Sequence, residues 1–205
     1  GLILVHEDSQ IIGNKRGIQL IQGSSGNTLF NNTISTTAEA PGPSIGINVS
    51  GSPISVPGSP TISPNSNIIT SNHISTFGGA DRTGIFITAG NSNIITFNTI
   101  RTSGLGIRNR GIFFNFLPLS SGPSFNAVAN NIIHTNGARL NDGILIIRGS
   151  FNTISANTIR TNGTADTNRG ITFQRASNNS VTGNDIATAG TFTNIGVSFR
   201  NSFSN

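Results

Sequence analysis

The stretch "FNTISANTIRTNG" at residues 151–163 contains one short phrase twice. Asn152 and Asn157 stand five residues apart, and each is followed two residues later by an isoleucine. Closely similar arrangements return as "GNTLFNNTISTT" at 26–37 and "SNIITFNTIRTS" at 92–103. A phrase that returns in this way indicates an internal repeat, and such repeats predict an architecture of stacked units.

Each repeat begins with a glycine followed by an apolar residue. The seven starts are Gly17, Gly46, Gly84, Gly111, Gly143, Gly170 and Gly196, with successive spacings of 29, 38, 27, 32, 27 and 26 residues. Six full repeats contain the pattern Asn-x-apolar-x-x-Asn-x-Ile. The first asparagines are Asn27, Asn67, Asn93, Asn126, Asn152 and Asn179. The second are Asn32, Asn72, Asn98, Asn131, Asn157 and Asn184. Spacings of 20 to 50 residues are typical of solenoids.

The apolar residues inside each repeat alternate with polar ones, a period that favours short strands and excludes helices. Three short strands per repeat predict an all-β fold, a single parallel β-helix (β-solenoid) of about seven coils. We expect one domain over 1–205: an N-terminal edge strand and loop at 1–16, six full coils at 17–195, and an incomplete last coil at 196–205.

Stacked coils place equivalent residues above one another, about 4.8 Å apart. The isoleucine after the second asparagine then forms an inward apolar column. The inward asparagines form two ladders of side-chain amide hydrogen bonds at the bends. The threonine two residues beyond that isoleucine is expected to act in a similar way at the next corner.

The two ends of the sequence suggest a mode of self-association. Counting back from Gly17 places "GLILV" at 1–5 in a third-strand position, and Asn205 reaches the first ladder position of an unfinished coil. We therefore expect head-to-tail stacking of copies, in which one copy completes the open coil of the next. The alternative is that the sequence is an excerpt of a longer β-helix.

The stretch "GILIIRGSFNTISANTIRTNG" at 143–163 resembles the right-handed parallel β-helix repeats of secreted carbohydrate-associated proteins, especially the NosD-type repeats. The resemblance covers about 17–199 and implies a right-handed coil. The wider family includes lyases, epimerases, phage tailspikes, adhesins and proteins without assigned chemistry. A copper role would follow from the NosD-type resemblance, but Cys and Met are absent and the histidines are scattered. We expect no metal site and no cofactor.

The composition of the chain argues against two further classes of protein, those that bind nucleic acid and those that span a membrane. A net charge of +5 over 205 residues, with no long basic run, argues against nucleic-acid binding. No apolar run approaches the ~20 residues of a membrane span. We expect an extracellular or cell-surface location.

Two outward columns are candidates for ligand binding. Phe86 and Phe113 occupy the outward middle position of the first strand on adjacent coils, and form a candidate platform for a sugar or partner. The alternative is that the inserted loops at 50–66 and 115–125 fold over them. Arg101, His134 and Arg160 follow the last isoleucine on adjacent coils and form a candidate strip for a polyanion, an acidic polysaccharide above all. Nearby loops add further arginines: Arg82, Arg108, Arg110, Arg139 and Arg169.

Catalysis has weaker support. The best candidate is Asp142 with Arg139 or His134, and its alternative is an aspartate that forms a turn or a loop ion pair. We assign no catalytic residue. The preferred interpretation is a non-catalytic structural solenoid, such as a surface fibre, filament subunit or adhesin stalk. The alternative is a carbohydrate-binding or carbohydrate-active β-helix that acts on an acidic polysaccharide.

Overall fold

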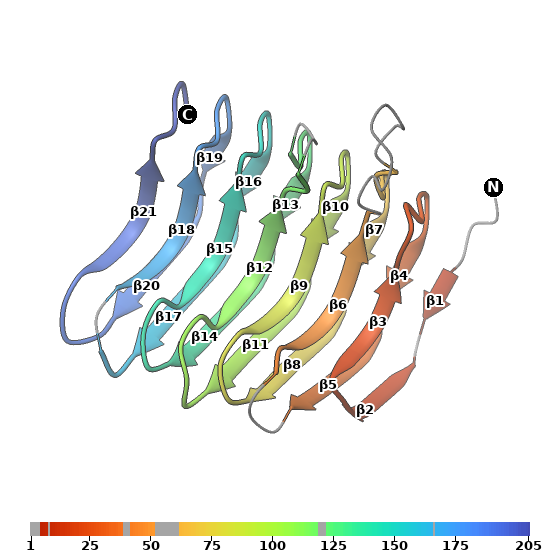
Figure 1. The fold of residues 1–205 in the computed structure, drawn as a ribbon, viewed down its shortest axis with the longest axis horizontal. Coiled ribbons are helices and arrows are strands. Elements are labelled where there is room, and N and C mark those ends of the chain that lie inside the picture. Colours follow the sequence, from red (N-terminus) through yellow and green to blue (C-terminus); the bar gives the residue numbers. More distant parts are fainter. Residues whose placement is uncertain (1–4, 8, 39–41, 52–61, 119–121, 166) are drawn as a thin grey trace.

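A computed structural model describes residues 5–7, 9–38, 42–51, 62–118, 122–165 and 167–205. The chain winds coil upon coil, and the coils follow one another in sequence order from the N-terminal to the C-terminal side of Figure 1. The strands form three parallel sheets of seven strands each. Within the described residues there is no helix, and thus none long and apolar enough to cross a bilayer.

We call the sheets A, B and C in the order in which each coil contributes to them. Sheet A contains β1 (Val5–Glu7), β4 (Thr28–Phe30), β7 (Ile68–Thr70), β10 (Ile94–Thr96), β13 (Ala127–Ala129), β16 (Thr153–Ser155) and β19 (Ser180–Thr182). Sheet B contains β2 (Gln10–Asn14), β5 (Thr33–Ala38), β8 (His73–Gly78), β11 (Thr99–Gly104), β14 (Ile132–Gly137), β17 (Thr158–Gly163) and β20 (Asp185–Ala189). Sheet C contains β3 (Arg16–Leu20), β6 (Ser44–Ser50), β9 (Arg82–Thr88), β12 (Arg110–Asn115), β15 (Asp142–Ile147), β18 (Asn168–Gln174) and β21 (Asn194–Arg200).

The strands pair in the register that the repeat predicts. In sheet B, Ile100 lies beside Ile74 and Ile133, and Ile133 lies beside Ile159. These isoleucines are fully buried and belong to one continuous apolar core. The interior is therefore built from vertical columns of equivalent side chains, as the sequence predicts.

Both predicted asparagine ladders are present and flank sheet A. In the first ladder, each side-chain amide from Asn27 to Asn179 donates to the Oδ1 atom of the next asparagine at 2.9–3.0 Å, and the series ends at Asn205. The second ladder runs in the same way from Asn32 to Asn184. The residue before each ladder asparagine has a positive φ, for example 56° at Phe151 and 53° at Ala156. Each bend thus takes a left-handed residue outside and a hydrogen-bonded amide inside.

The glycines that start the first six coils, from Gly17 to Gly170, keep sheets B and C in close contact. A Cβ atom added to Gly111 would clash with the Cγ2 methyl of Ile133 and lie 2.5 Å from the carbonyl oxygen of Gly143. The apolar column of sheet B therefore occupies the space that a side chain at this position would need.

The threonine column does not form a ladder, contrary to expectation. Thr76, Thr102, Thr135 and Thr161 are buried, and their hydroxyls have no hydrogen-bond partner within the described structure. Thr36 differs because its hydroxyl accepts a hydrogen bond from Ser44. An asparagine amide carries both a donor and an acceptor at the end of a longer side chain and links successive coils, whereas these four threonine hydroxyls do not.

The position predicted for "GLILV" is wrong. Val5 pairs with Thr28 in sheet A, and Ile11 is the residue that pairs with Ile34 in sheet B. Residues 1–4 lie outside the described residues, and the segment 1–16 contains two complete strands instead of one. The count from Gly17 failed because the link from β2 to β3 is shorter than in later coils.

Candidate functional site

The candidate site is a groove along the outer face of sheet B. It has a volume of about 440 Å³ and is lined by seven outward side chains and two residues of the threonine column. The outward ones are Phe77, Arg101, Ser103, His134, Asn136, Arg160 and Asn162. We call this hollow the sheet B groove. Its walls come from β8, β11, β14 and β17, so the ladders and isoleucine columns that hold these strands also fix the groove.

The predicted cationic column forms one side of the groove. Arg101 pairs in register with His134, and His134 with Arg160, so the three side chains follow one another along the coil axis. Ser75 precedes them and Ala187 follows them in the same column. The structure therefore brings all three predicted residues together.

The charges of this column are unequal. Partial burial, followed by the positive charges of Arg101 and Arg160, lowers the pKa of His134, so the imidazole is neutral at pH 7. Arg160 is paired with Asp185, whose carboxylate Oδ2 accepts from Nη2 at 2.5 Å. This pair raises the pKa of Arg160 and lowers that of Asp185. Arg101 is exposed at the other end of the column.

The groove continues into a larger, more apolar hollow at the corner between sheets B and C. This hollow has a volume of about 830 Å³ and shares Phe77, Ser103 and Asn136 with the groove. Glycines 78, 79, 104 and 137 contribute to its lining, and Leu105, which is 96% exposed, stands at its rim. Phe77 is 42% exposed at the junction of the two hollows. The sequence did not indicate a role for Phe77, because the residues around it follow the same pattern as in the other repeats.

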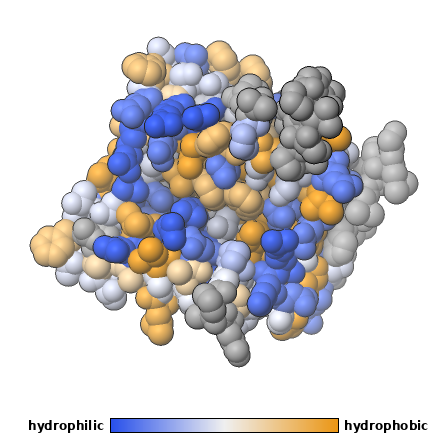
Figure 2. All heavy atoms as spheres, viewed as in Figure 1, coloured by the Kyte–Doolittle hydropathy of each residue, from blue (hydrophilic) through white to orange (hydrophobic). Residues whose placement is uncertain are grey.

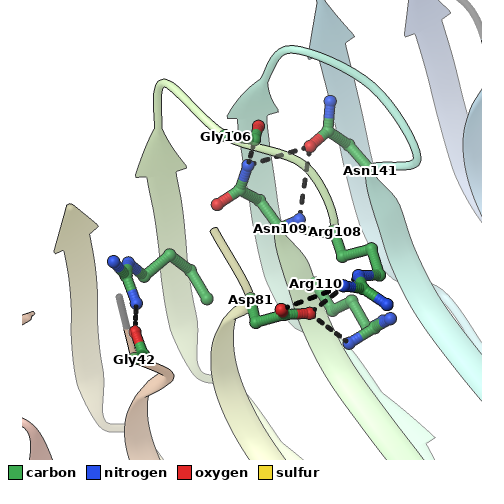
Figure 3. Close-up of polar contacts among 8 residues, drawn as sticks. Gly42, Asp81, Gly106, Arg108, Asn109, Arg110 and Asn141 are labelled. Atoms are coloured by element: carbon green, nitrogen blue, oxygen red, sulfur yellow. Dashed lines mark hydrogen bonds and ion pairs between the residues drawn. The ribbon is translucent and has the colours of Figure 1, made fainter. Parts of the chain in front are cut away.

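The other predicted arginines mostly have internal roles. Arg82 is fully buried, and its guanidinium donates to the carbonyl oxygens of Ala38 and Gly42. Arg108 and Arg110 both approach the carboxylate of Asp81, at 2.9 and 3.8 Å (Figure 3). These side chains hold loops at the corner between sheets B and C and do not extend the groove.

Phe86 and Phe113 lie side by side on the outer face of sheet C. Their ring centroids are 5.1 Å apart at an interplanar angle of 35°, and the guanidinium of Arg110 lies 4.6 Å from the centroid of Phe113. Figure 2 shows apolar side chains near the centre of this view, bordered by hydrophilic ones. Phe113 is therefore contacted both by the ring of Phe86 and by the guanidinium of Arg110. Phe86 lines an open hollow of about 430 Å³ with Arg16, Gln19 and Asn48.

The inserted loops are described only in part. Residues 52–61 and 119–121 lie outside the described residues, so the cover that these loops were expected to provide is not placed. Phe116 packs its ring against the guanidinium of Arg148, at 4.1 Å. The described part of the second insertion therefore packs against Arg148, in the turn that follows β15.

Asp142 does not pair with Arg139 or His134. Its carboxylate accepts a hydrogen bond from the Thr172 hydroxyl at 2.7 Å and lies 3.5 Å from Nη1 of Arg169. Burial raises the pKa of Asp142, while Thr172, Arg169 and Arg110 act in the opposite direction. These contacts place Asp142 in a buried polar cluster on sheet C, away from the sheet B groove.

A third asparagine ladder at the corner between sheets B and C was missed. The amide of Asn109 donates to Asn141 at 3.1 Å (Figure 3). The amide of Asn141 donates to Asn168 at 2.8 Å, and that of Asn168 to Asn194 at 3.2 Å. Each member stands two residues before a coil-starting glycine, for example in "NRG" at 109–111 and "NDG" at 141–143. This Asn-x-Gly signal was available in the sequence. Among the described residues, no group of three or more His, Asp or Glu side chains is placed to hold a metal ion.

Comparison with known proteins gives the family but little about function. A search of curated proteins found no match. Among solved structures, the chain is similar to tailspike protein 2 of the Escherichia coli O157:H7 bacteriophage CAB120, with 16% identity and a TM-score of 0.31. The match covers 97% of this chain and 38% of the tailspike chain. The profile described as "right handed beta helix region" matches residues 4–186. With this match and three parallel sheets stacked coil upon coil, the chain belongs to the right-handed β-helix family.

Proposed function

We propose that this β-helix is a non-catalytic, surface-exposed protein that binds an acidic polysaccharide along the sheet B groove. The observation that carries the proposal is the column Arg101–His134–Arg160, which lies in register along one side of a groove. A polysaccharide that runs parallel to the coil axis meets one member of the column at each coil. Phe77 supplies an aromatic surface at the apolar end of the groove, of the kind on which sugar rings pack.

Binding is favoured over cleavage by the chemistry of the groove lining. The described lining residues are cationic, amide, hydroxyl or aromatic, and none is a carboxylate. Asp185, the carboxylate nearest to the column, is held by Arg160 with its pKa lowered, which opposes a role as a general acid. An extracellular or cell-surface location fits a polysaccharide ligand and belongs to the same proposal.

Affinity electrophoresis through gels that contain polygalacturonate, hyaluronate or neutral dextran tests the proposal. We expect retardation by an acidic polymer and none by dextran. The double variant Arg101→Gln/Arg160→Gln should bind at least tenfold more weakly, since two charge contacts of about 1 kcal/mol each are lost. The control is Arg175→Gln/Arg200→Gln, which removes the same charge from exposed positions at the end of sheet C. Equal weakening in both double variants, or no retardation of the wild type, would reject the groove.

End-to-end stacking of copies is a second proposal, supported by the described edge of β21. Phe199 is 49% exposed and stacks on Phe173, with ring centroids 5.2 Å apart and planes 6° apart. Apolar side chains at an exposed strand edge favour pairing with another strand edge. Light scattering over a range of protein concentrations tests it. A mass that stays monomeric at the highest concentration would reject stacking.

A further inference from the structure

The cationic column has a defined spacing along the coil axis. Arg101 on β11, His134 on β14 and Arg160 on β17 are consecutive partners in a parallel sheet. Neighbouring strands are about 4.8 Å apart, so the two arginines are about 10 Å apart at the backbone. Their separation is fixed by backbone pairing and by the second asparagine ladder, which runs through Asn98, Asn131 and Asn157 beneath them.

The central member of the column is the only one whose charge changes near neutral pH. The charged groups beside His134 are Arg101 on one neighbouring strand and Arg160 on the other, and Arg160 is also bound to Asp185 on β20. Partial burial and these two guanidinium groups lower the pKa of His134. At neutral pH the column therefore presents the guanidinium groups of Arg101 and Arg160, the second of them shared with Asp185, on either side of a neutral imidazole. In acid the imidazole between them is also charged.

We propose that the sheet B groove discriminates acidic glycans by the spacing of their charges, and that protonation of His134 changes the preferred spacing. A sugar residue in an extended chain is about as long as one coil step, so each coil faces one sugar. At neutral pH the groove fits a glycan with a carboxylate on every second sugar. In acid it fits a glycan with a carboxylate on every sugar. This inference rests on the proposed function and specifies its ligand class.

At neutral pH, the uncharged imidazole of His134 faces the uncharged sugar of a glycan that carries a carboxylate on every second sugar. It offers one hydrogen-bond donor and one acceptor to the hydroxyl groups of the uncharged sugar between two acidic ones. A carboxylate at the same place would instead lose its water without gaining an opposite charge, which is unfavourable. The same contact becomes favourable once the imidazole is protonated.

Binding of two polymers at two pH values tests the inference. Hyaluronate carries one carboxylate per disaccharide, polygalacturonate carries one per sugar, and both stay ionised at pH 7.5 and pH 5.0. For the wild type, we expect the affinity ratio of polygalacturonate to hyaluronate to rise about tenfold at pH 5.0, which corresponds to about 1.4 kcal/mol. Because each polymer is compared with itself across pH, differences between the two backbones cancel.

Two variants at the central position provide the controls. His134→Gln keeps a neutral polar side chain, and its affinity ratio should stay constant between the two pH values. His134→Arg carries a permanent charge, and its ratio at pH 7.5 should already be shifted in the direction that the wild type takes in acid. The serines and alanine found at equivalent positions, such as Ser75 and Ala187, indicate that the fold tolerates substitution here.

The outcomes separate the two proposals. A wild-type ratio that is the same at both pH values, or a His134→Gln ratio that shifts as much as the wild type, would overturn charge-spacing discrimination and leave the polysaccharide site intact. Failure of both polymers to bind at either pH would overturn the site itself, and the discrimination with it.

Discussion

Sheet A lies between two unbroken asparagine ladders, whereas the ladder at the corner between sheets B and C stops at Asn109. At that corner Arg82 takes the position equivalent to Asn109 in the preceding coil, and Ser44 takes it one coil earlier. The Oδ1 atom of Asn109 and the Nε atom of Arg82 have no hydrogen-bond partner within the described structure. Both regions use asparagine amides to link neighbouring coils, but the series of links is unbroken only beside sheet A.

Both the residue at the ladder position and the regularity of the spacing differ between the two regions. The two ladders beside sheet A are always five residues apart, so every amide meets its neighbour in the same geometry. The link from sheet B to sheet C varies in length, for example from Ile34 to Gly46 and from Ile74 to Gly84. A long arginine side chain reaches carbonyl groups that an asparagine would not reach. The regular side of the coil supplies rigidity, and the irregular corner leaves space for the hollow beside the groove.

The largest expected effect comes from breaking a ladder beside sheet A. The Asn131 amide donates to Asn157 and to two backbone carbonyls, and its Oδ1 atom accepts from the backbone and side chain of Asn98. Asn131→Ala should lower the free energy of unfolding by about 3–5 kcal/mol, because several buried groups lose their partners at once. Urea denaturation measures this loss. Asn130→Ala changes the exposed neighbour and is the control; equal losses in the two variants would contradict the ladder's role.

The third ladder should be weaker. Asn141 donates to Asn168 at 2.8 Å, but its contacts with the Asn162 carbonyl and the Asn109 backbone are both 3.3 Å long. Asn141→Ala should therefore cost about 1–2 kcal/mol in the same urea experiment. A loss as large as that of Asn131→Ala would show that the corner is as well satisfied as the bends beside sheet A.

The threonine column predicts a substitution that raises the free energy of unfolding instead of lowering it. The buried hydroxyl of Thr135 has no partner within the described residues. Thr135→Val keeps the shape and removes an unsatisfied polar group, so it should stabilise the protein by about 1 kcal/mol. Thr36→Val is the matched control and should destabilise, because it leaves the Ser44 hydroxyl without its acceptor. Thermal unfolding of both variants measures the two signs, and destabilisation by both would indicate that Thr135 has a hydrogen-bond partner after all.

The sequence predicted those features that depend on constant spacing. The isoleucine columns, the two ladders beside sheet A and the alignment of Arg101 with His134 and Arg160 all follow from one repeated phrase. Features that depend on how loops of different length fold were not predictable in this way. Arg82 is buried because carbonyls from another loop surround it, and Phe77 lines the groove because the neighbouring corner is hollow.

Two errors had other causes. The third ladder was missed although its Asn-x-Gly signal repeats, because the alignment took the glycine as its starting point and ignored the two residues before it. The strand at Val5–Glu7 was assigned to the wrong sheet because the link from β2 to β3 is shorter than later links, and the first coil lacks the asparagine pair that marks the register elsewhere.

The smallest expected effect concerns pH and again contrasts two positions of sheet B. His134 lies between two arginines and has a lowered pKa in the folded protein, whereas the unfolded chain takes up a proton near pH 6.5. As pH falls below about 6.5, the unfolded state binds this proton first, so stability falls until the lowered folded pKa is reached. His134→Gln should reduce the slope of melting temperature against pH in this window. The comparison variant is His73→Gln, at an exposed position whose partners in register are Thr33 and Thr99. Equal slopes for the wild type and His134→Gln would show that burial and the two neighbouring arginines do not lower the pKa of this imidazole in the folded protein.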